Sequence, residues 1–223
     1  MKKRSSLRWI MSLAAFGIAL ACGPARAGMM HLKVDTVKSE IVASVLDPLS
    51  HLRDLPSNAD GSFDIITGEI EGDPDNLAST GHVKLVINAT TYNSGNSMRD
   101  RNVIGSALET GQYPGIHFES TGIEDVQVVA PGATGNLTVI GNLTIHGTTR
   151  QMRIPVSVSM TPDGILTATG EVTFDYTDFG VKVPRLAFLI PTSKQVTVKY
   201  RVLTTAPDTA ASPTPSAAAT GGQ

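Results

Sequence analysis

The amino-acid sequence predicts an all-β fold, an antiparallel barrel or sandwich of about eight strands with one short helix. Three observations support this prediction. Apolar and polar residues alternate with a period of two, turn dipeptides separate the alternating stretches, and no strand–helix–strand rhythm is present. Alternation gives each strand one apolar and one polar face, which is typical of antiparallel sheets. A closed barrel of about eight strands either fills with side chains or encloses one small ligand.

The clearest strand pattern runs from Leu137 to Ile145, where every second residue is apolar or glycine. The stretches 83–89, 116–118, 152–160, 166–174 and 196–202 repeat it. Small residues on the apolar faces favour a cavity, and these are Ala89, Gly141, Ala168 and Gly170. The apolar-face residues that we expect to line such a cavity, or else to fill the core, are Leu85, Ile87, Phe118, Leu143, Ile145, Val156, Val158, Val172 and Phe174.

Glycine-containing dipeptides mark the expected turns between strands. Pro155 lies inside a strand pattern, where it cannot donate a backbone hydrogen bond, so we expect an edge or a bulge there. Asp178-Phe179-Gly180 is expected to form a turn with Phe179 packed against the barrel. The expected turn dipeptides are Asp60-Gly61, Pro131-Gly132, His146-Gly147 and Asp163-Gly164.

One stretch, Ser97 to Glu109, predicts a helix. Ser97 and Asp100 suit a capping arrangement for its first turn. Four apolar residues then share one side at helical spacing, and Gly111 and Pro114 follow the expected end. The apolar residues of this helix are Val103, Ile104, Ala107 and Leu108.

The first 27 residues predict a secretory signal peptide. A basic start, 13 apolar residues from Trp9 to Ala21 and the cleavage signal Ala25-Arg26-Ala27 follow one another in the required order. The apolar run is too short to span a bilayer as a helix, and we expect no membrane span elsewhere. We therefore expect export to the periplasm. An alternative is acylation of Cys22, which follows a lipoprotein-like Ala19-Leu20-Ala21 and would anchor the protein to a membrane.

Removal of residues 1–27 leaves 13 basic residues against 20 acidic ones, a net charge of −7. Such an acidic chain offers no basic stripe, so we expect no nucleic-acid partner. Residues 206–223 consist of alanine, proline, threonine, serine and glycine with a single aspartate and a terminal glutamine. This composition predicts a disordered tail, because it buries too little apolar surface to fold. One domain, residues 28–205, remains.

Several motifs in this domain together resemble one family. A helix containing Arg99-Asp100 precedes Pro114-Gly115-Ile116-His117-Phe118-Glu119-Ser120, and Gly141 begins the string Gly-Asn-Leu-Thr-Ile-His-Gly-Thr. Gly61-Ser62-Phe63 and Asp178-Phe179-Gly180-Val181 add to the pattern. In this order and spacing the sequence resembles the YceI-like family of periplasmic polyisoprenoid-binding proteins. It departs from the family pattern at four positions, Leu32 (Trp in the family), Lys38 (His), Asn102 (His) and Tyr176 (Arg).

The resemblance implies a lipocalin-like barrel that encloses an elongated apolar pocket for an isoprenoid chain, such as a quinone tail or a polyprenyl carrier. Arg99 then has two interpretations. It either belongs to a solvated helix start or meets a polar head group at the mouth of the barrel, since guanidinium groups bind such oxygens in pairs. A binding protein for a long apolar ligand is the function that we expect. The alternative is an envelope scaffold or lipoprotein domain with a filled core.

Enzymatic and metal-dependent functions find little support in the sequence. The five histidines show no metal-ligand spacing, and Ser50-His51 with Asp54 lacks the frame of a nucleophilic site. We therefore expect no catalytic residue, no metal and no cofactor.

Overall fold

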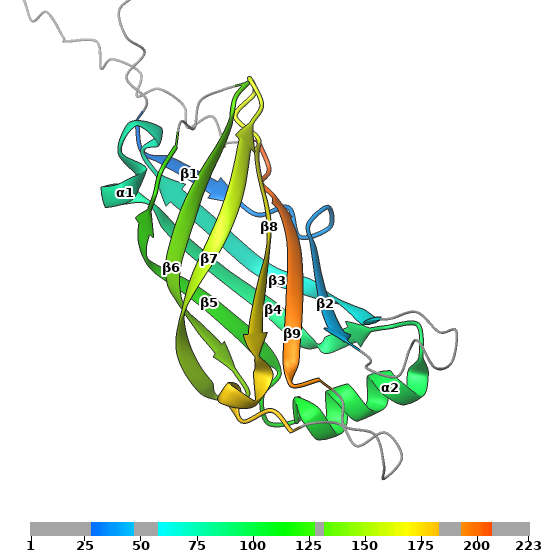
Figure 1. Cartoon of the computed structure of the whole chain (residues 1–223). Coiled ribbons are helices and arrows are strands. Elements are labelled where there is room, and N and C mark those ends of the chain that lie inside the picture. Colours follow the sequence, from blue (N-terminus) through cyan, green and yellow to red (C-terminus); the bar gives the residue numbers. More distant parts are fainter. Residues whose placement is uncertain (1–27, 47–57, 128–131, 183–192, 207–223) are drawn as a thin grey trace, which may run out of the picture.

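The computed structural model (Figure 1) describes residues 28–46, 58–127, 132–182 and 193–206. Its core is a closed antiparallel barrel in the strand order β2-β9-β8-β7-β6-β5-β4-β3, with β3 pairing back onto β2. The all-β prediction is therefore confirmed, and the sheet is a barrel rather than a sandwich. The strands are β1 (Met30–Lys33), β2 (Glu40–Leu46), β3 (Asn58–Gly72), β4 (His82–Asn93), β5 (Gly115–Glu124), β6 (Thr134–Ile145), β7 (Thr148–Met160), β8 (Leu166–Asp175) and β9 (Gln195–Leu203).

Strand β3 closes the barrel because it is long enough to pair with three other strands. Its first part pairs with β2, its last part pairs with β1, and its other edge pairs with β4. The short strand β1 thus continues the wall beyond β2, and a bridge between Val34 and Thr204 ties its end to the chain after β9. Two irregularities interrupt the β3–β4 register, between Ser62 and Asp64 and between Ile65 and Thr67. The first sets residues 89–92 of β4 against Phe63 alone, and the second adds one residue to β3. An extra residue of this kind bends the strand and shifts its inward residues by one position.

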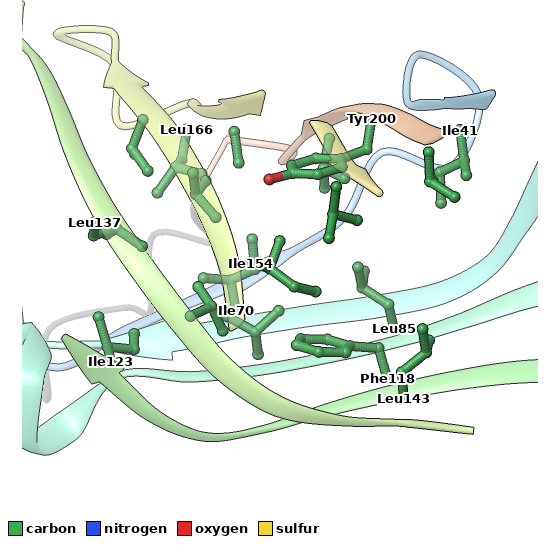
Figure 2. A pocket seen from close by; sticks show the side chains of 18 of the residues that line it. Ile41, Ile70, Leu85, Phe118, Ile123, Leu137, Leu143, Ile154, Leu166 and Tyr200 are labelled. Carbon is green, nitrogen blue, oxygen red and sulfur yellow. The ribbon is translucent and has the colours of Figure 1, made fainter. Parts of the chain in front are cut away.

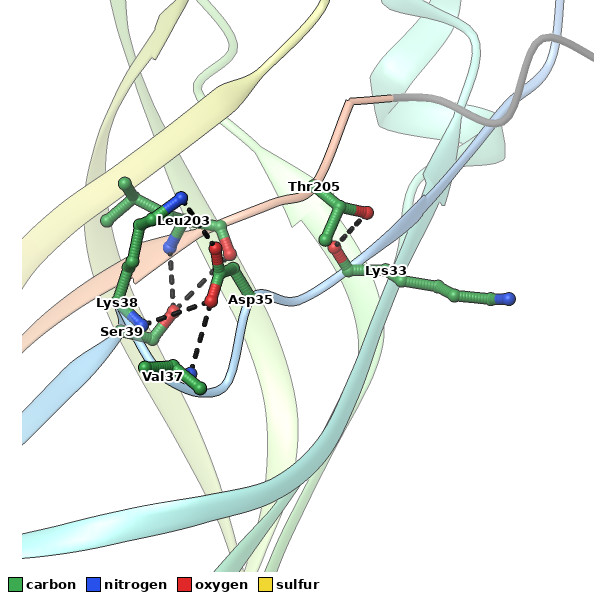
Figure 3. Close-up of polar contacts among 7 residues, drawn as sticks. All are labelled: Lys33, Asp35, Val37, Lys38, Ser39, Leu203 and Thr205. Atoms are coloured by element: carbon green, nitrogen blue, oxygen red, sulfur yellow. Dashed lines mark hydrogen bonds and ion pairs between the residues drawn. The ribbon is translucent and has the colours of Figure 1, made fainter.

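The turn between β1 and β2 is fastened to β9 by polar contacts (Figure 3). The Asp35 carboxylate accepts hydrogen bonds from the backbone amides of Val37 and Lys38, at 3.2 and 3.1 Å. Ser39 Oγ both donates to the Leu203 carbonyl and accepts from the Leu203 amide. Because these bonds and the Lys38 side chain favour the charged carboxylate, the pKa of Asp35 is lowered. The turn therefore helps to close the barrel.

The predicted alternation is confirmed in the strands. Along β6 the residues at Leu137, Val139, Gly141, Leu143 and Ile145 are all buried, and the residues between them are exposed or partly buried. Inward residues of β4 through β9 join the main core cluster, and a second cluster lies around Ile41, Ile65 and Val202.

Turns at His146-Gly147 and Asp163-Gly164 are confirmed, with positive φ at His146, Gly147 and Gly164. The turn expected at Asp60-Gly61 is wrong, because both residues lie inside β3 and pair with β2. Gly61 serves a close approach instead, since a Cβ atom there would overlap the ring of Tyr92. The dipeptide Pro131-Gly132 falls partly outside the described residues.

The predicted helix is present but is divided into two forms. Residues Ser97–Asn102 form the α-helix α2, and Val103–Ala107 continue it as a π-helical turn, η3. The predicted cap is wrong by one residue: Asn96 is the N-cap, and its side chain accepts hydrogen bonds from the amides of Met98 and Arg99. Asp100 instead accepts from the amide and hydroxyl of Ser94. The helix lies across one end of the barrel (Figure 1) and buries Ala107 and Leu108 in the main core cluster.

Three further short elements complete the described fold. The 3-10 turn η2 (Pro74–Asn76) and the helix α1 (Leu77–Thr80) follow β3 at the other end of the barrel (Figure 1). The 3-10 turn η4 (Tyr176–Phe179) follows β8 and carries Phe179, which is only 1% exposed. The expected packing of Phe179 against the barrel is thus confirmed. The predicted signal peptide and all but the first residue of the predicted tail, 206–223, lie outside the described residues.

Candidate binding cavity

The barrel encloses a cavity of about 210 Å³ that extends along its interior. All nine strands contribute to the lining, together with Pro74 of η2 and Leu77 of α1. In Figure 2 the labelled side chains point from opposite walls toward a common space. Among the described residues that line the cavity, Glu71 is the one charged residue. The space is therefore elongated and almost wholly apolar.

Nine of the ten residues that the sequence singled out for ligand binding line this cavity. They come from five strands, β4 to β8, so the barrel brings together positions that are up to 89 residues apart in the chain, Leu85 and Phe174. The tenth, Arg99, lies on α2 and is not among the residues that line the cavity. The nine lining residues are Leu85, Ile87, Phe118, Leu143, Ile145, Val156, Val158, Val172 and Phe174.

Sequence reasoning missed the lining residues from the first three strands and from β9. Phe63 and Ile70 of β3 face the same cavity although they are seven residues apart, an odd spacing that the bulge between Ile65 and Thr67 makes possible. A period-two pattern cannot reveal them, since this bulge reverses its phase. For β9 the alternation at Val196, Val198, Tyr200 and Val202 already marked the inward face, and three of these four residues line the cavity. The lining residues that no strand pattern had marked include Leu32, Ile41, Ala43 and Ile123, whereas Val83, Ile116 and Leu137 lay on predicted apolar faces but were not chosen as ligand-binding residues.

Small residues contribute to the cavity differently from the prediction. Of the four that we expected to leave space, only Ala168 lines it. A Cβ atom on Gly141 would overlap the ring of Phe118, and one on Gly170 would overlap the hydroxyl of Tyr200. These two glycines therefore make room for large side chains and so set the positions of Phe118 and Tyr200 in the wall.

Tyr200 carries a polar atom at the wall of this apolar space. Its hydroxyl donates a short hydrogen bond to the backbone carbonyl of Pro155 on β7. Burial raises the pKa of Tyr200 above its ordinary value, because the phenolate would lose hydration there. In Figure 2 the hydroxyl is the oxygen seen among the drawn side chains. Tyr200 is thus held neutral, with its proton directed at the protein backbone.

A cluster of polar side chains fastens the helical end of the barrel. Glu109, just after η3, lies 2.8 Å from Nε2 of His146 and 2.6 Å from Nζ of Lys182. These two partners lower the pKa of Glu109, with Lys182 as the larger cause. The ring of Tyr113 packs on His146 with 4.5 Å between centroids. The cluster joins the helix, the β6–β7 turn and the chain after η4.

The described residues contain no group of three or more histidine, cysteine, aspartate or glutamate side chains that could hold a metal ion. Among the same residues, no helix has the length and apolar character needed to cross a membrane. Two of the histidines lie beside single carboxylates, His31 at 3.0 Å from Glu71 and His82 at 3.6 Å from Glu119.

Known proteins share both the sequence pattern and the fold. A UPF0312 protein of Vibrio parahaemolyticus is 31% identical over 145 residues, which cover 64% of this chain and 71% of the relative. A UPF0312 protein of Shewanella putrefaciens is 29% identical over 176 residues, covering 76% of this chain and 86% of the relative.

Two solved structures show the same fold at low sequence identity. BcnA of Burkholderia cenocepacia has a TM-score of 0.63 at 22% identity, covering 77% of this chain and 99% of that one. A polyisoprenoid binding domain from Saccharophagus degradans has a TM-score of 0.59 at 15% identity, covering 81% and 100%. The model of the YceI-like domain matches residues 32–203, which reach from β1 to the end of β9. The chain therefore belongs to the YceI-like family.

Proposed function

We propose that the protein binds an elongated apolar lipid of the isoprenoid type, a quinone tail or a polyprenyl chain, inside its barrel. The observation that carries this proposal is the cavity, which is lined on every side by aliphatic and aromatic side chains. The solved neighbour from Saccharophagus degradans is described as a polyisoprenoid binding domain, and we extend that ligand class to this chain. A carrier or storage role follows from a site that binds without reacting.

Free energy favours this use of the cavity. Side chains that line a space without filling it cost about 24 cal/mol per Å³, so about 210 Å³ costs roughly 5 kcal/mol. That is comparable with the whole stability of many domains. Each buried CH₂ group contributes about 0.8 kcal/mol in the opposite direction, so a chain of a few isoprene units offsets the cost. A cavity of about 150 Å³ already admits benzene in another protein, so the space here is sufficient for part of a lipid chain.

We further propose that the protein works in the periplasm. The basic start, the apolar run and Ala25-Arg26-Ala27 support export and cleavage before Gly28. Cleavage there would remove Trp9 and Cys22, the only tryptophan and the only cysteine. Intact mass of the protein recovered from the periplasm tests this, with a chain beginning at Gly28 as the expected result. An acylated N-terminal Cys22 would instead place the protein on a membrane.

The experiment that tests lipid binding is extraction and mass spectrometry of the protein purified from the bacterial envelope. We expect an isoprenoid lipid in the parent protein and its loss in Leu143→Trp and Val158→Trp, because both side chains are buried at the cavity wall. Thr144→Trp is the control, since Thr144 lies on the outer face of β6 next to Leu143. It should retain the lipid.

Stability measurements on the same variants separate a carrier from a filled scaffold. In a lipid cavity the new indole occupies space that the ligand had filled, so urea unfolding should change little. In a close-packed core, overpacking costs about 1–3 kcal/mol. A parent protein without lipid, together with destabilised Leu143→Trp and Val158→Trp variants, would contradict the proposal.

A further inference from the structure

Among the described strands of the closed barrel, β2 to β9, the strands β7 and β8 share the shortest ladder. Strand β7 pairs with β6 over its whole length, from Thr148 to Ser159, and β8 pairs with β9 from Thr167 to Asp175. The ladder between β7 and β8, however, covers only Ser157–Met160 against Leu166–Thr169. Below it, residues 148–156 of β7 and 170–175 of β8 face each other without ladder hydrogen bonds. We refer to these two segments as the β7–β8 seam.

Two residues explain why the β7–β8 ladder stops at Ser157 and Thr169. Pro155 has no N–H group to donate, so it cannot continue the backbone pairing toward β8. This agrees with the edge that its position in a strand pattern predicted. Opposite it, Gly170 has no side chain, and a Cβ atom there would overlap both the Pro155 carbonyl and the Tyr200 hydroxyl. The hydroxyl of Tyr200, on β9, uses this space to reach under β8 and bind the Pro155 carbonyl. The Tyr200–Pro155 hydrogen bond therefore lies next to the point where the β7–β8 ladder ends.

The seam leads directly to the cavity. Ile154 on β7 and Val172 and Phe174 on β8 belong to the two seam segments and also line the cavity, as does Tyr200 beside them. Both margins of the seam are thus apolar on their inner side. At the helical end of the barrel, by contrast, η3 buries Ala107 and Leu108, and Glu109 ties it to His146 and Lys182.

From these contacts we infer that the seam is a lateral entry site for the apolar chain, with the Tyr200–Pro155 hydrogen bond as its latch. An apolar chain can pass between two strands that have no backbone hydrogen bonds to break, whereas every other pair of neighbouring barrel strands is joined by a longer ladder. Breaking the latch costs one hydrogen bond. The inference rests on the proposed lipid binding and adds the route by which the lipid reaches the cavity.

The first test removes the latch and keeps the ring. Tyr200→Phe should exchange dansyl-labelled farnesol roughly two- to ten-fold faster in stopped-flow fluorescence, the rate factor expected for one lost hydrogen bond. Its equilibrium affinity should change much less. Tyr92→Phe is the matched control, since Tyr92 is a buried strand tyrosine on β4 that does not line the cavity. Equal exchange rates in the parent, Tyr200→Phe and Tyr92→Phe would overturn the latch.

The second test closes the seam covalently. Arg153→Cys with Thr173→Cys places two thiols on the outer face of the two seam segments, in a chain whose single cysteine is replaced by Cys22→Ser. Ser159→Cys with Thr167→Cys is the control on the same strands and face, where the ladder is intact. Each pair is joined by a bis-maleimide and compared with its own unjoined form.

Joining the seam pair should slow uptake of the labelled farnesol at least ten-fold, and joining the control pair should leave uptake unchanged. If both joined proteins take up the probe at the rate of their unjoined forms, the lipid enters through an end of the barrel and the inference is wrong. A parent protein that binds no probe and co-purifies with no lipid would contradict the proposed function itself. The two failures therefore give different results.

Discussion

Single residues in this barrel are placed by contacts that span long distances in the sequence. Glu109 accepts a hydrogen bond from Lys182, 73 positions later in the chain. Gly61 leaves room for the ring of Tyr92, which a Cβ atom at that position would overlap. Neither contact leaves a local pattern. For this reason the local sequence at Asp60-Gly61 indicated a turn and nothing indicated the role of Glu109, whereas the buried position of Phe179 followed from its local motif.

Acid should weaken the fold through Glu109. Its pKa is lowered in the folded protein, so the stabilising contacts are fully present above its ordinary value of 4.5 and are lost as pH falls through the lower folded value. We expect Glu109→Gln to melt at a lower temperature than the parent at pH 7. The difference should shrink as the pH falls below 4.5 and close only below the lowered pKa of the folded protein, where the parent carboxyl is itself neutral.

The control for this pH series is Glu119→Gln. Glu119 also faces a histidine, His82, but at 3.6 Å and with more than half of its side chain exposed. Exposed pairs contribute little, so this variant should melt with the parent at both pH values. A constant difference between Glu109→Gln and the parent across the pH range would show that the carboxylate charge is not the cause.

Gly61→Ala tests whether glycine is required at this strand position because the ring of Tyr92 packs against its Cα atom. The added Cβ atom would overlap the ring of Tyr92, so we expect a loss of about 1–3 kcal/mol in urea unfolding. Gly122→Ala is the matched control on β5, where nothing lies within 4 Å of the new atom. This variant should be neutral or slightly stabilised, because alanine restricts the unfolded chain. Equal losses in both variants would contradict the close-approach explanation.

At the scale of elements, the strands were the most predictable part of the molecule. Alternation is a local signal with a fixed period, so β4 to β9 could be located together with their inward faces, and the faces of β4 to β8 supplied nine lining residues of the cavity. Strand β3 could not be interpreted in this way because the bulge between Ile65 and Thr67 reverses the phase. The latch from Tyr200 to Pro155 was also out of reach, since it depends on how three strands are stacked side by side.

The helix gives a second test at this scale, because its N-cap is Asn96, one residue before the predicted Ser97. Asn96 accepts hydrogen bonds from two helix amides through its side chain, at 3.1 and 3.2 Å. Asn96→Ala should therefore cost about 0.5–2 kcal/mol of stability. Ser97→Ala, one residue later and exposed, should cost almost nothing. Chemical denaturation of the two variants measures the difference, and a larger loss for Ser97→Ala would restore the cap that the sequence suggested.

For the whole molecule, the segments that begin and end the described domain help to close the barrel, together with its strands. Thr205 donates its amide to the Lys33 carbonyl at 2.8 Å, and the buried Thr204 exchanges hydrogen bonds with Leu166 at 2.9 Å. The segments that begin and end the described domain are thus joined side by side. A fold of this kind depends on residues close to its C-terminal boundary, although the sequence gives no strand pattern beyond Leu203.

Two truncations locate this boundary. Removal of residues 206–223 should leave the melting temperature and lipid content unchanged, because a segment of this composition is expected to contribute no packing. Removal from Thr204 onward also deletes four hydrogen bonds to Leu166 and Lys33, and at roughly 0.5–1.5 kcal/mol each it should cost about 2–6 kcal/mol. Thermal unfolding of the two chains measures the contrast. A drop of several degrees after the shorter truncation would show that residues 206–223 pack on the barrel, and equal stability of both truncated chains would show that Thr204 and Thr205 do not help to close it.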